Sequence, residues 1–365
     1  MRPLKITTLL FIELSLLLAG TGCSTTTQAT AKKEAAARWK GVRVAMALQI
    51  AEKQYKTGQI TKCRETLQEA MKTQNDDPRV FILMARVLFE LQDLSAAEEH
   101  LQTARRLNPS LAETDYWQGV IAQSASQPEQ AHQAYFAAYA KEPNSLVYLC
   151  AMLESKLALG RAEETAKLSS DRFIDFPRSV PLRLIAAHSY MVLKKYDKAE
   201  EFYQQALDVD SASIEAQEGL AHVLYLEKKY SRAIPILQKL TTRRTPDRTD
   251  LRFMLGNCHL AMRSYSPAIR TYEDSLAKDP LQPNVRFNLA KARLLNDQAG
   301  LADQELRMVL QQQPENPQAW ELLGHVYLQE RKYDQAQSAY HQAIQKGTNR
   351  TKLASYLEIC SGGKP

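Results

Sequence analysis

A small side chain recurs at a fixed interval along most of this 365-residue chain. The interval is 34 residues, with one step of 35, and the positions are Cys63, Ala97, Ala131, Thr165, Ala199, Ala233, Ala268, Ala302 and Ala336. A spacing held over nine copies indicates stacked structural units, because each unit buries its apolar face only against its neighbours. The register therefore predicts a repeat protein and leaves no segment over for a separate catalytic domain.

Each copy reads as two helices joined by a polar break. The last copy is the clearest, with one helical face marked by Trp320, Leu323, Gly324 and Tyr327 and a second by Tyr333, Ala336, Tyr340 and Ala343. Where two helices cross closely, only small side chains let their backbones approach. Prolines near the ends of the copies stop the second helix, because proline lacks a donor and clashes with the preceding turn: Pro109, Pro143, Pro177, Pro280 and Pro314.

This unit, residues 317–347, closely resembles the tetratricopeptide repeat (TPR), which has the same period. The resemblance implies an all-α fold: a right-handed α-solenoid of about nine helix–turn–helix repeats. The solenoid is expected over residues 44–350, with repeats starting at 44, 78, 112, 146, 180, 214, 249, 283 and 317. Residues 351–365 are expected to form a capping helix, Thr351–Cys360, and a short tail.

Two places depart from the repeat pattern. Repeat four has unusual residues at its packing positions, namely Leu153, Thr165, Ser169 and Arg172, which predicts a loosely packed joint around residues 146–179. One extra residue in Thr241–Thr249 predicts a longer turn between repeats six and seven.

Residues 1–22 have the organisation of a secretory signal peptide. Arg2 and Lys5 are followed by a mostly apolar run, Ile6–Ala19, which is too short to cross a bilayer. The small residues before Cys23 resemble a bacterial lipobox, although Gly20 stands where that family usually has leucine. The resemblance implies diacylglycerol on the Cys23 thiol and an acylated (for example palmitoylated) new N-terminus. Ordinary cleavage and a retained anchor are the alternatives.

The segment 23–43 is expected to join a lipid anchor to the first repeat. Ser24–Ala31 reads as a polar tether, and the sequence from Lys32 onward is helical in composition. The lipobox resemblance implies a membrane-anchored lipoprotein of the cell envelope that faces the periplasm. Ser24 in place of aspartate favours the outer membrane, by resemblance to lipoprotein sorting in some bacteria.

The charge pattern argues against nucleic-acid binding. The net charge of +6 is spread along the chain, and no block of five or six like charges occurs.

The cysteines and histidines give little indication of a catalytic or metal-binding site. Outside Cys23, no cysteines form a Cys-x-x-Cys pair, so four are expected to be small buried side chains: Cys63, Cys150, Cys258 and Cys360. His188 and His222 occupy the same slot in adjacent repeats near Glu218, and His325 occupies it again. No third ligand stands at a suitable spacing, so neither a metal nor another cofactor is expected.

The sequence also lacks recognised catalytic motifs, so no catalytic residue and no enzyme activity are expected. It predicts a scaffold that binds other proteins, with membrane attachment through the lipid. Three alternatives stay open: an accessory regulator of an envelope enzyme such as a cell-wall hydrolase, an enzyme that uses the histidines, and a soluble cytoplasmic adaptor.

The TPR resemblance implies that first helices line a concave groove through their second, fifth, ninth and twelfth positions. Aromatic residues beside mixed charges suit an extended peptide or a partner helix. Phe253, Gln318 and Leu322 replace the groups of a carboxylate clamp, so no such clamp is expected. The predicted partner-binding residues are Arg79, Ile82, Arg86, Phe89, Tyr116, Gln123, Glu154, Leu184, His188, Met191, Glu218, His222, Tyr225, Phe253, Asn257, Phe287, Lys291, Glu321 and His325.

Overall fold

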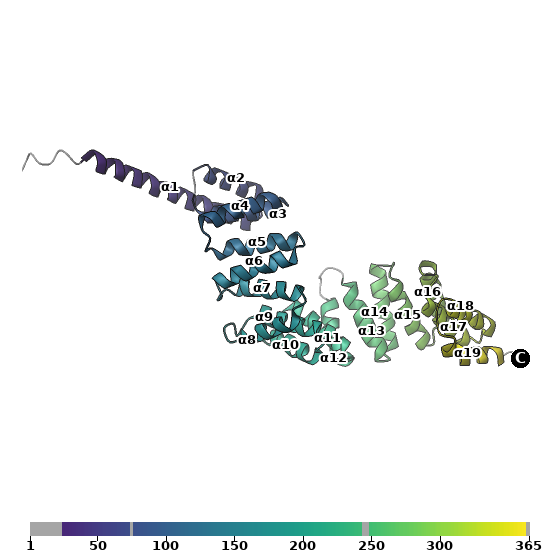
Figure 1. Cartoon of the computed structure of the whole chain (residues 1–365). Coiled ribbons are helices and arrows are strands. Elements are labelled where there is room, and N and C mark those ends of the chain that lie inside the picture. Colours follow the sequence, from purple (N-terminus) through teal and green to yellow (C-terminus); the bar gives the residue numbers. More distant parts are fainter. Residues whose placement is uncertain (1–23, 74–75, 243–247, 363–365) are drawn as a thin grey trace, which may run out of the picture. The chain divides into compact units, whose positions relative to one another are not determined.

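The computed structural model describes residues 24–73, 76–242 and 248–362 (Figure 1). These residues form nineteen α-helices and no strand, which confirms the all-α repeat solenoid. The helices are α1 (Ser24–Lys56), α2 (Ile60–Met71), α3 (Pro78–Glu90), α4 (Leu94–Leu107), α5 (Ala112–Ser124), α6 (Pro128–Lys141), α7 (Leu146–Ala158), α8 (Ala162–Asp171), α9 (Val180–Val192), α10 (Tyr196–Val209), α11 (Ile214–Leu226), α12 (Tyr230–Thr242), α13 (Thr249–Ala261), α14 (Tyr265–Lys278), α15 (Pro283–Leu295), α16 (Ala299–Gln312), α17 (Pro317–Gln329), α18 (Tyr333–Gln345) and α19 (Arg350–Gly362).

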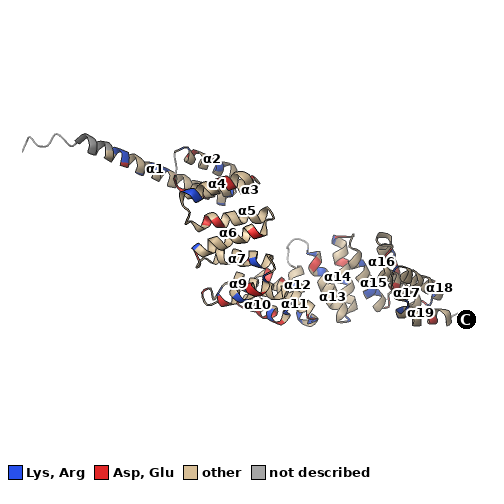
Figure 2. Ribbon diagram, viewed as in Figure 1, with Lys and Arg blue, Asp and Glu red and all other residues tan. Residues whose placement is uncertain are grey.

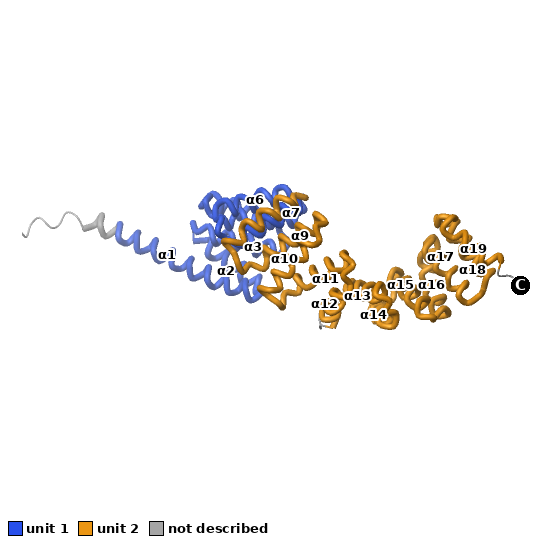
Figure 3. Tube along the Cα trace, turned by 90° about the horizontal axis from the view of Figure 1, so that it is seen from below, with its two compact units in different colours: residues 1–159 blue, residues 160–365 orange. Residues whose placement is uncertain are grey.

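The chain divides into two compact units at Leu159–Gly160 (Figure 3). Unit 1 contains α1–α7 and unit 2 contains α8–α19, so the division falls inside repeat four. Helix α8 has only ten residues. Its buried Thr165 and Ser169 hydroxyls donate to the carbonyls of Arg161 and Thr165. Such side chains pack less apolar surface than the alanines and leucines of the other repeats. This accounts for the departure of repeat four from the repeat pattern.

The turns inside the repeats share one backbone conformation. Its middle residue has positive φ, at Gly58, Gln92, Ser126, Gly160, Lys194, Lys228, Arg263, Asp297 and Arg331. In most of these turns the next amide donates to a carbonyl five residues back, as Asp93 N does to Leu88 O at 2.9 Å. This is the Schellman motif, which satisfies carbonyls left free at a helix end. Seven of the nine residues are not glycine, so composition does not mark the position.

Buried tyrosines of second helices pack against glycines of first helices. A Cβ added to these glycines would lie 2.4–2.6 Å from the ring of the tyrosine in the same repeat, in the pairs Gly119–Tyr135, Gly256–Tyr272 and Gly324–Tyr340. Other repeats pair alanine with leucine at these two positions: Ala51–Leu67, Ala85–Leu101, Ala221–Leu237 and Ala290–Leu306. The size of one residue therefore limits the size of the other. In repeat five the ring of Tyr203 lies instead against Gly219 of the next first helix.

The fourth residue of several first helices donates to the carbonyl of the residue six positions earlier, at the end of the preceding repeat. The donors are a tryptophan, two arginines and a glutamine: Trp320 to Pro314 O (2.9 Å), Arg286 to Pro280 O (3.2 Å), Arg183 to Pro177 O (2.8 Å) and Gln217 to Ser211 O (2.7 Å). In α5 the fourth residue is Asp115, which pairs with Lys141, and Lys141 Nζ donates to Pro109 O at 2.6 Å. These bonds satisfy carbonyls that the helices leave free.

The N-terminal segment differs from its prediction. Ser24–Ala31, expected as a polar tether, is helical and belongs to α1. The helix continues backward because adding a residue to an existing helix needs no new nucleation. Residues 1–22 and Cys23 lie outside the described residues, as does most of the turn expected to be long, at residues 243–247. No described helix is both long enough and apolar enough to cross a membrane.

The C-terminal helix α19 covers repeat nine. Leu353 and Cys360 are buried in the same apolar cluster as Leu323 and Tyr340. This helix takes the place that the first helix of a further repeat would occupy, as a solenoid cap must.

Candidate protein-binding face

An arginine lies between aromatic rings on the first helices of unit 1. The guanidinium carbon of Arg86 (α3) is 4.6 Å from the ring centre of Tyr55 (α1) and 5.0 Å from that of Trp117 (α5). Its Nη1 is 3.7 Å from a Glu113 carboxylate oxygen. The Nε atom is buried and has no hydrogen-bond partner among the described residues. We call Tyr55, Arg86, Phe89, Tyr116 and Trp117 the Arg86 cluster.

Further aromatic rings extend this cluster. The rings of Phe89 and Trp117 meet edge-on at 6.1 Å, and Tyr116 lies 5.4 Å from Tyr148 of α7. Burial raises the pKa of Tyr116, and it raises that of Tyr148 to about 12. Both phenols therefore stay neutral at physiological pH and present hydroxyl donors as well as rings.

In unit 2 the corresponding positions form an amide and hydroxyl network. The Asn257 amide oxygen accepts from the Tyr272 hydroxyl at 2.6 Å and from the Asn288 amide at 2.8 Å. The Asn257 amide nitrogen donates to the Tyr225 hydroxyl at 3.3 Å. These side chains bind one another across three successive first helices, α11, α13 and α15, so they already have internal partners.

The histidines have partners of their own. His188 lies edge-on to Tyr203, and its Nε2 is 4.0 Å from Glu215. Glu218, expected beside the histidines, forms an ion pair with Arg248. Burial lowers the pKa of His188, which favours the neutral ring.

The capping helix occupies the last part of this surface. Lys352 of α19 is 2.6 Å from Glu321, and the ring of Tyr356 lies 4.7 Å from that of His325. His325 Nδ1 is also 2.8 Å from the Tyr340 hydroxyl. Glu321 and His325 are therefore engaged by the chain itself.

Replacing His325 with asparagine is expected to reduce the loss of stability in acid. Burial lowers the pKa of His325 below its usual 6.5, so the folded chain takes up a proton less readily than the unfolded chain. Stability is then fully present above about pH 6.5 and falls as pH drops through the folded pKa. Asn257 holds the equivalent position and bonds Tyr272, so asparagine can keep the tyrosine bond. Urea unfolding at pH 7.5 and pH 5 measures the difference; an unchanged difference would contradict the expectation.

Two residues of the predicted set are buried. Ile82 and Leu184 are only 1% and 7% exposed, and they belong to the apolar cores of unit 1 and unit 2. Five others are exposed, namely Arg79, Gln123, Glu154, His222 and Lys291. The remainder are partly buried: Arg86, Phe89, Tyr116, His188, Met191, Glu218, Tyr225, Phe253, Asn257, Phe287, Glu321 and His325. Their role in binding stays a prediction.

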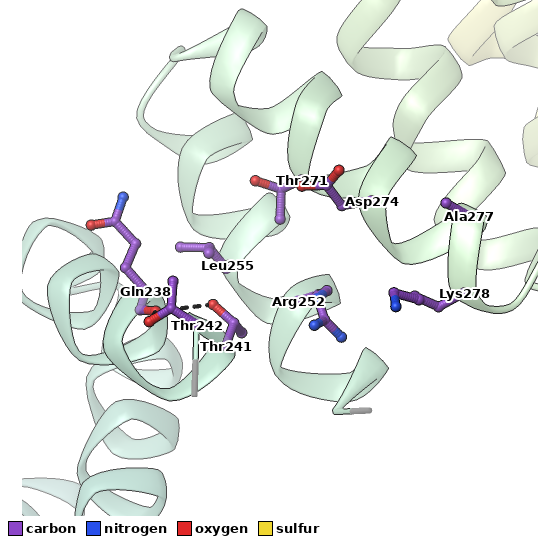
Figure 4. A pocket seen from close by; sticks show the side chains of 9 residues that line it. All are labelled: Gln238, Thr241, Thr242, Arg252, Leu255, Thr271, Asp274, Ala277 and Lys278. Atoms are coloured by element: carbon purple, nitrogen blue, oxygen red, sulfur yellow. Dashed lines mark hydrogen bonds between the residues drawn. The ribbon is translucent and has the colours of Figure 1, made fainter. Parts of the chain in front are cut away.

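Three cavities lie on a different surface, and no predicted residue lines them. Each is formed by two successive second helices and the first helix between them: α4–α5–α6 (720 Å³), α12–α13–α14 (380 Å³) and α16–α17–α18 (530 Å³). Figure 4 shows Gln238, Arg252 and Asp274 around the second of these. Because the three cavities recur at the same place in the repeat, we interpret them as a consequence of helix packing.

The described residues contain no group of three histidine, cysteine, aspartate or glutamate side chains that could hold a metal. The four described cysteines are free thiols, three of them buried: Cys63, Cys258 and Cys360. Burial raises the pKa of Cys150 and that of Cys258 to about 12, which makes these thiols poor nucleophiles.

Stacked helical hairpins with an aromatic and charged first-helix surface define a repeat protein of the helical-solenoid class. Residues 82–145, 186–249, 224–294 and 319–354 match the tetratricopeptide repeat family. These segments cover more than half of the chain, and the chain belongs to that family. TPR proteins are generally non-catalytic scaffolds that bind other proteins or peptides, and the fold of this chain is of that kind.

Two curated relatives are eukaryotic. Mouse tetratricopeptide repeat protein 21A is 26% identical over 264 residues, which cover 63% of this chain and 20% of the relative. The RNA polymerase-associated protein CTR9 of Saccharomyces cerevisiae is 38% identical over 108 residues, 29% of this chain and 9% of the relative. This chain thus matches a fifth or less of the length of either. Among solved structures, pilF of Pseudomonas aeruginosa has 15% identity and a TM-score of 0.51, covering 60% of this chain and 97% of that one, and it shares the fold.

Two residues of the Arg86 cluster, and Tyr148 beside it, were not predicted from the sequence. Trp117 stands at the sixth position of its repeat and Tyr148 at the third, outside the slots assigned to the groove. Tyr55 stands at a twelfth position, in the first repeat, and would have been found had that repeat been included.

Proposed function

We propose that this chain is a non-catalytic scaffold of the bacterial cell envelope that holds a peptide or a partner helix on the first-helix surface of unit 1. The observation that carries the proposal is Arg86 placed between the rings of Tyr55 and Trp117. Arginine, tryptophan and tyrosine are the residues that most often dominate binding energy at protein interfaces.

The geometry fits such a role. The rings already pack edge-on or tilted against one another in the chain alone, so binding orders few side chains. The guanidinium is partly exposed, and the one carboxylate contact it makes within the described residues, with Glu113, is long at 3.7 Å. A partner carboxylate or backbone carbonyl can reach this cation, while an apolar partner side chain packs on Phe89, Tyr116 and Trp117.

The envelope location rests on the lipobox resemblance at Cys23. A lipid on that residue would hold the scaffold at a membrane, facing the periplasm, with the outer membrane favoured. There the scaffold would serve the assembly of an envelope, pilus or secretion complex. Palmitate label at Cys23 that disappears in Cys23→Ala is the result expected.

A photoreactive amino acid at Gln123 is expected to crosslink the partner in the native cell. Gln123 is exposed on first helix α5, about two helical turns after Tyr116, whereas Gln133 is exposed on second helix α6 of the same hairpin. The same probe at Gln133 is therefore the matched control. Mass spectrometry of the crosslinked bands identifies the partner. Equal crosslinking from both positions, or crosslinking from Gln133 alone, would contradict binding on this face.

In the Gln123 probe strain, Arg86→Ala or Trp117→Ala is expected to lower the crosslink yield by about tenfold or more, because interface residues of this kind contribute about 2 kcal/mol or more. Arg64→Ala is the control, since Arg64 is an exposed arginine on second helix α2 of the same unit and lies outside the predicted set. A yield unchanged by Arg86→Ala and Trp117→Ala would overturn the role of the cluster.

A further inference from the structure

Helix α1 has an apolar stripe that no described part of the chain covers. One side of the helix, with Val44, Leu48 and Ala51, packs into unit 1. On the other side four large apolar residues are exposed: Trp39, Val42, Met46 and Ile50. Their spacing of three and four residues puts them on one face of the helix. Trp39 is 70% exposed, and no other helix exposes so many large apolar side chains among the described residues.

The same part of the helix is strongly basic. Between residues 30 and 50 it carries Lys32, Lys33, Arg38, Lys40 and Arg43, against a single acidic residue, Glu34. The chain as a whole has a net charge of +6, so this short segment supplies much of it. Figure 2 shows the basic residues of α1 in blue.

We propose that this segment of α1 lies on an anionic phospholipid surface, with Trp39, Val42, Met46 and Ile50 entering the boundary between headgroups and acyl chains. An apolar stripe bearing tryptophan, flanked by lysine and arginine, is the pattern of helices that lie in this interface. The lysines and arginines would meet lipid phosphates, and their long apolar stems let the charges reach the headgroups.

Charge favours a membrane over a second copy of the chain as the occupant. Two copies pairing through this stripe would bring two segments of like charge together, which costs binding energy. An anionic lipid surface has the complementary charge. The inference rests on the proposed envelope location for the supply of that surface, but it does not need a lipid on Cys23.

The test uses Trp39 as a local reporter of depth. Trp117→Phe and Trp320→Phe leave it as the chain's only tryptophan, and circular dichroism checks that the helices remain. The full-length protein is reconstituted into vesicles whose acyl chains carry bromine, with either phosphatidylglycerol or phosphatidylcholine headgroups. Strong quenching of Trp39 is expected with phosphatidylglycerol, at least about fivefold more than with phosphatidylcholine, because each basic residue near an anionic surface favours binding about fivefold.

Two variants serve as controls. Ala37→Trp with Trp39→Phe moves the indole by about 200° around the same helix, and it should escape quenching. Lys40→Glu with Arg43→Glu should reduce the quenching of Trp39 to the phosphatidylcholine level. Equal quenching from positions 37 and 39, or none in phosphatidylglycerol, would overturn the inference. So would sedimentation showing dimers whose Trp39 is shielded without any bromine quenching.

Mass spectrometry of the N-terminal peptide of the same protein reports whether Cys23 carries lipid. Quenching of Trp39 in a protein without lipid on Cys23 would support the α1 inference and reject the proposed anchor. Lipid on Cys23 without quenching of Trp39 would support the anchor and reject the α1 inference.

Discussion

Replacing Glu305 with alanine is expected to destabilise unit 2 by about 3–5 kcal/mol, the usual cost of removing one partner from a buried ion pair. Glu305 Oε2 is 2.6 Å from Arg286 and its Oε1 is 2.9 Å from Arg293. The side chains of the two arginines are only 16% and 12% exposed, and that of Glu305 is 12% exposed. Without Glu305, no carboxylate among the described residues pairs with Arg286, and Arg293 keeps its contact with Glu273. Urea unfolding followed by circular dichroism measures the loss.

Repeat nine supplies the rescue. At the positions of Arg286, Arg293 and Glu305 it has Trp320, Tyr327 and Ala339, whose packing needs no ion pair. The triple variant Arg286→Trp, Arg293→Tyr, Glu305→Ala is therefore expected to recover most of the lost stability. The introduced tryptophan can still donate to Pro280 O, as Trp320 does to Pro314 O. Replacing buried charges by packed residues of similar volume is often neutral or stabilising.

Glu315→Ala is the surface control. Glu315 is 2.6 Å from Lys346 but is 75% exposed, so its loss should change the stability by less than about 1 kcal/mol. A Glu305→Ala loss as small as that of Glu315→Ala would contradict the importance of the buried network.

Gly324→Ala is expected to destabilise repeat nine by about 1–3 kcal/mol, although alanine is the better helix former by about 1 kcal/mol. The added Cβ would lie 2.4 Å from a ring carbon of Tyr340, which is fully buried and cannot move aside. Amide hydrogen exchange in α17 and α18 localises the effect, since repeats of a solenoid depend mainly on their neighbours.

The sign of this effect should reverse in a Tyr340→Leu background. Repeat eight has alanine and leucine at these positions, Ala290 and Leu306, and both are fully buried. With the ring removed, Gly324→Ala is expected to stabilise by up to about 1 kcal/mol. The double-mutant cycle measures this coupling directly. A Gly324→Ala cost that is the same in both backgrounds would show that the tyrosine ring is not the cause.

The sequence predicted the fold well because the register depends on small residues at helix crossings, and a crossing tolerates few alternatives. The pairing of Gly324 with Tyr340 was less visible. Both residues are apparent in the sequence, but only the structure shows that they touch. The left-handed turn residues were invisible for another reason, since most of them, such as Lys228 and Arg331, are not glycine.

The candidate site was predicted only in part. The repeat positions that line the groove in the family as a whole indicate which side of the helix faces the groove, but not how deeply each side chain is buried. It therefore assigned Ile82 to the surface, although this residue lies in the core, and it missed Trp117, whose ring reaches Arg86 from a neighbouring position. The helical conformation of Ser24–Ala31 was missed because the polar composition of that segment was read without the helix that follows it.

The hydrogen bond made by the fourth residue of the first helices has a consequence for recognising distant repeats. Judged by hydropathy, Trp320 differs sharply from the polar Arg286 and Gln217, so a sequence comparison would score their exchange as loss of the repeat pattern. Judged by the bond each donates to a carbonyl six residues earlier, they are equivalent. A sequence search that scores this position by the ability of the side chain to donate a hydrogen bond, and not by its apolar character, should detect diverged repeats in other chains. A search with a consensus of residue types would miss them.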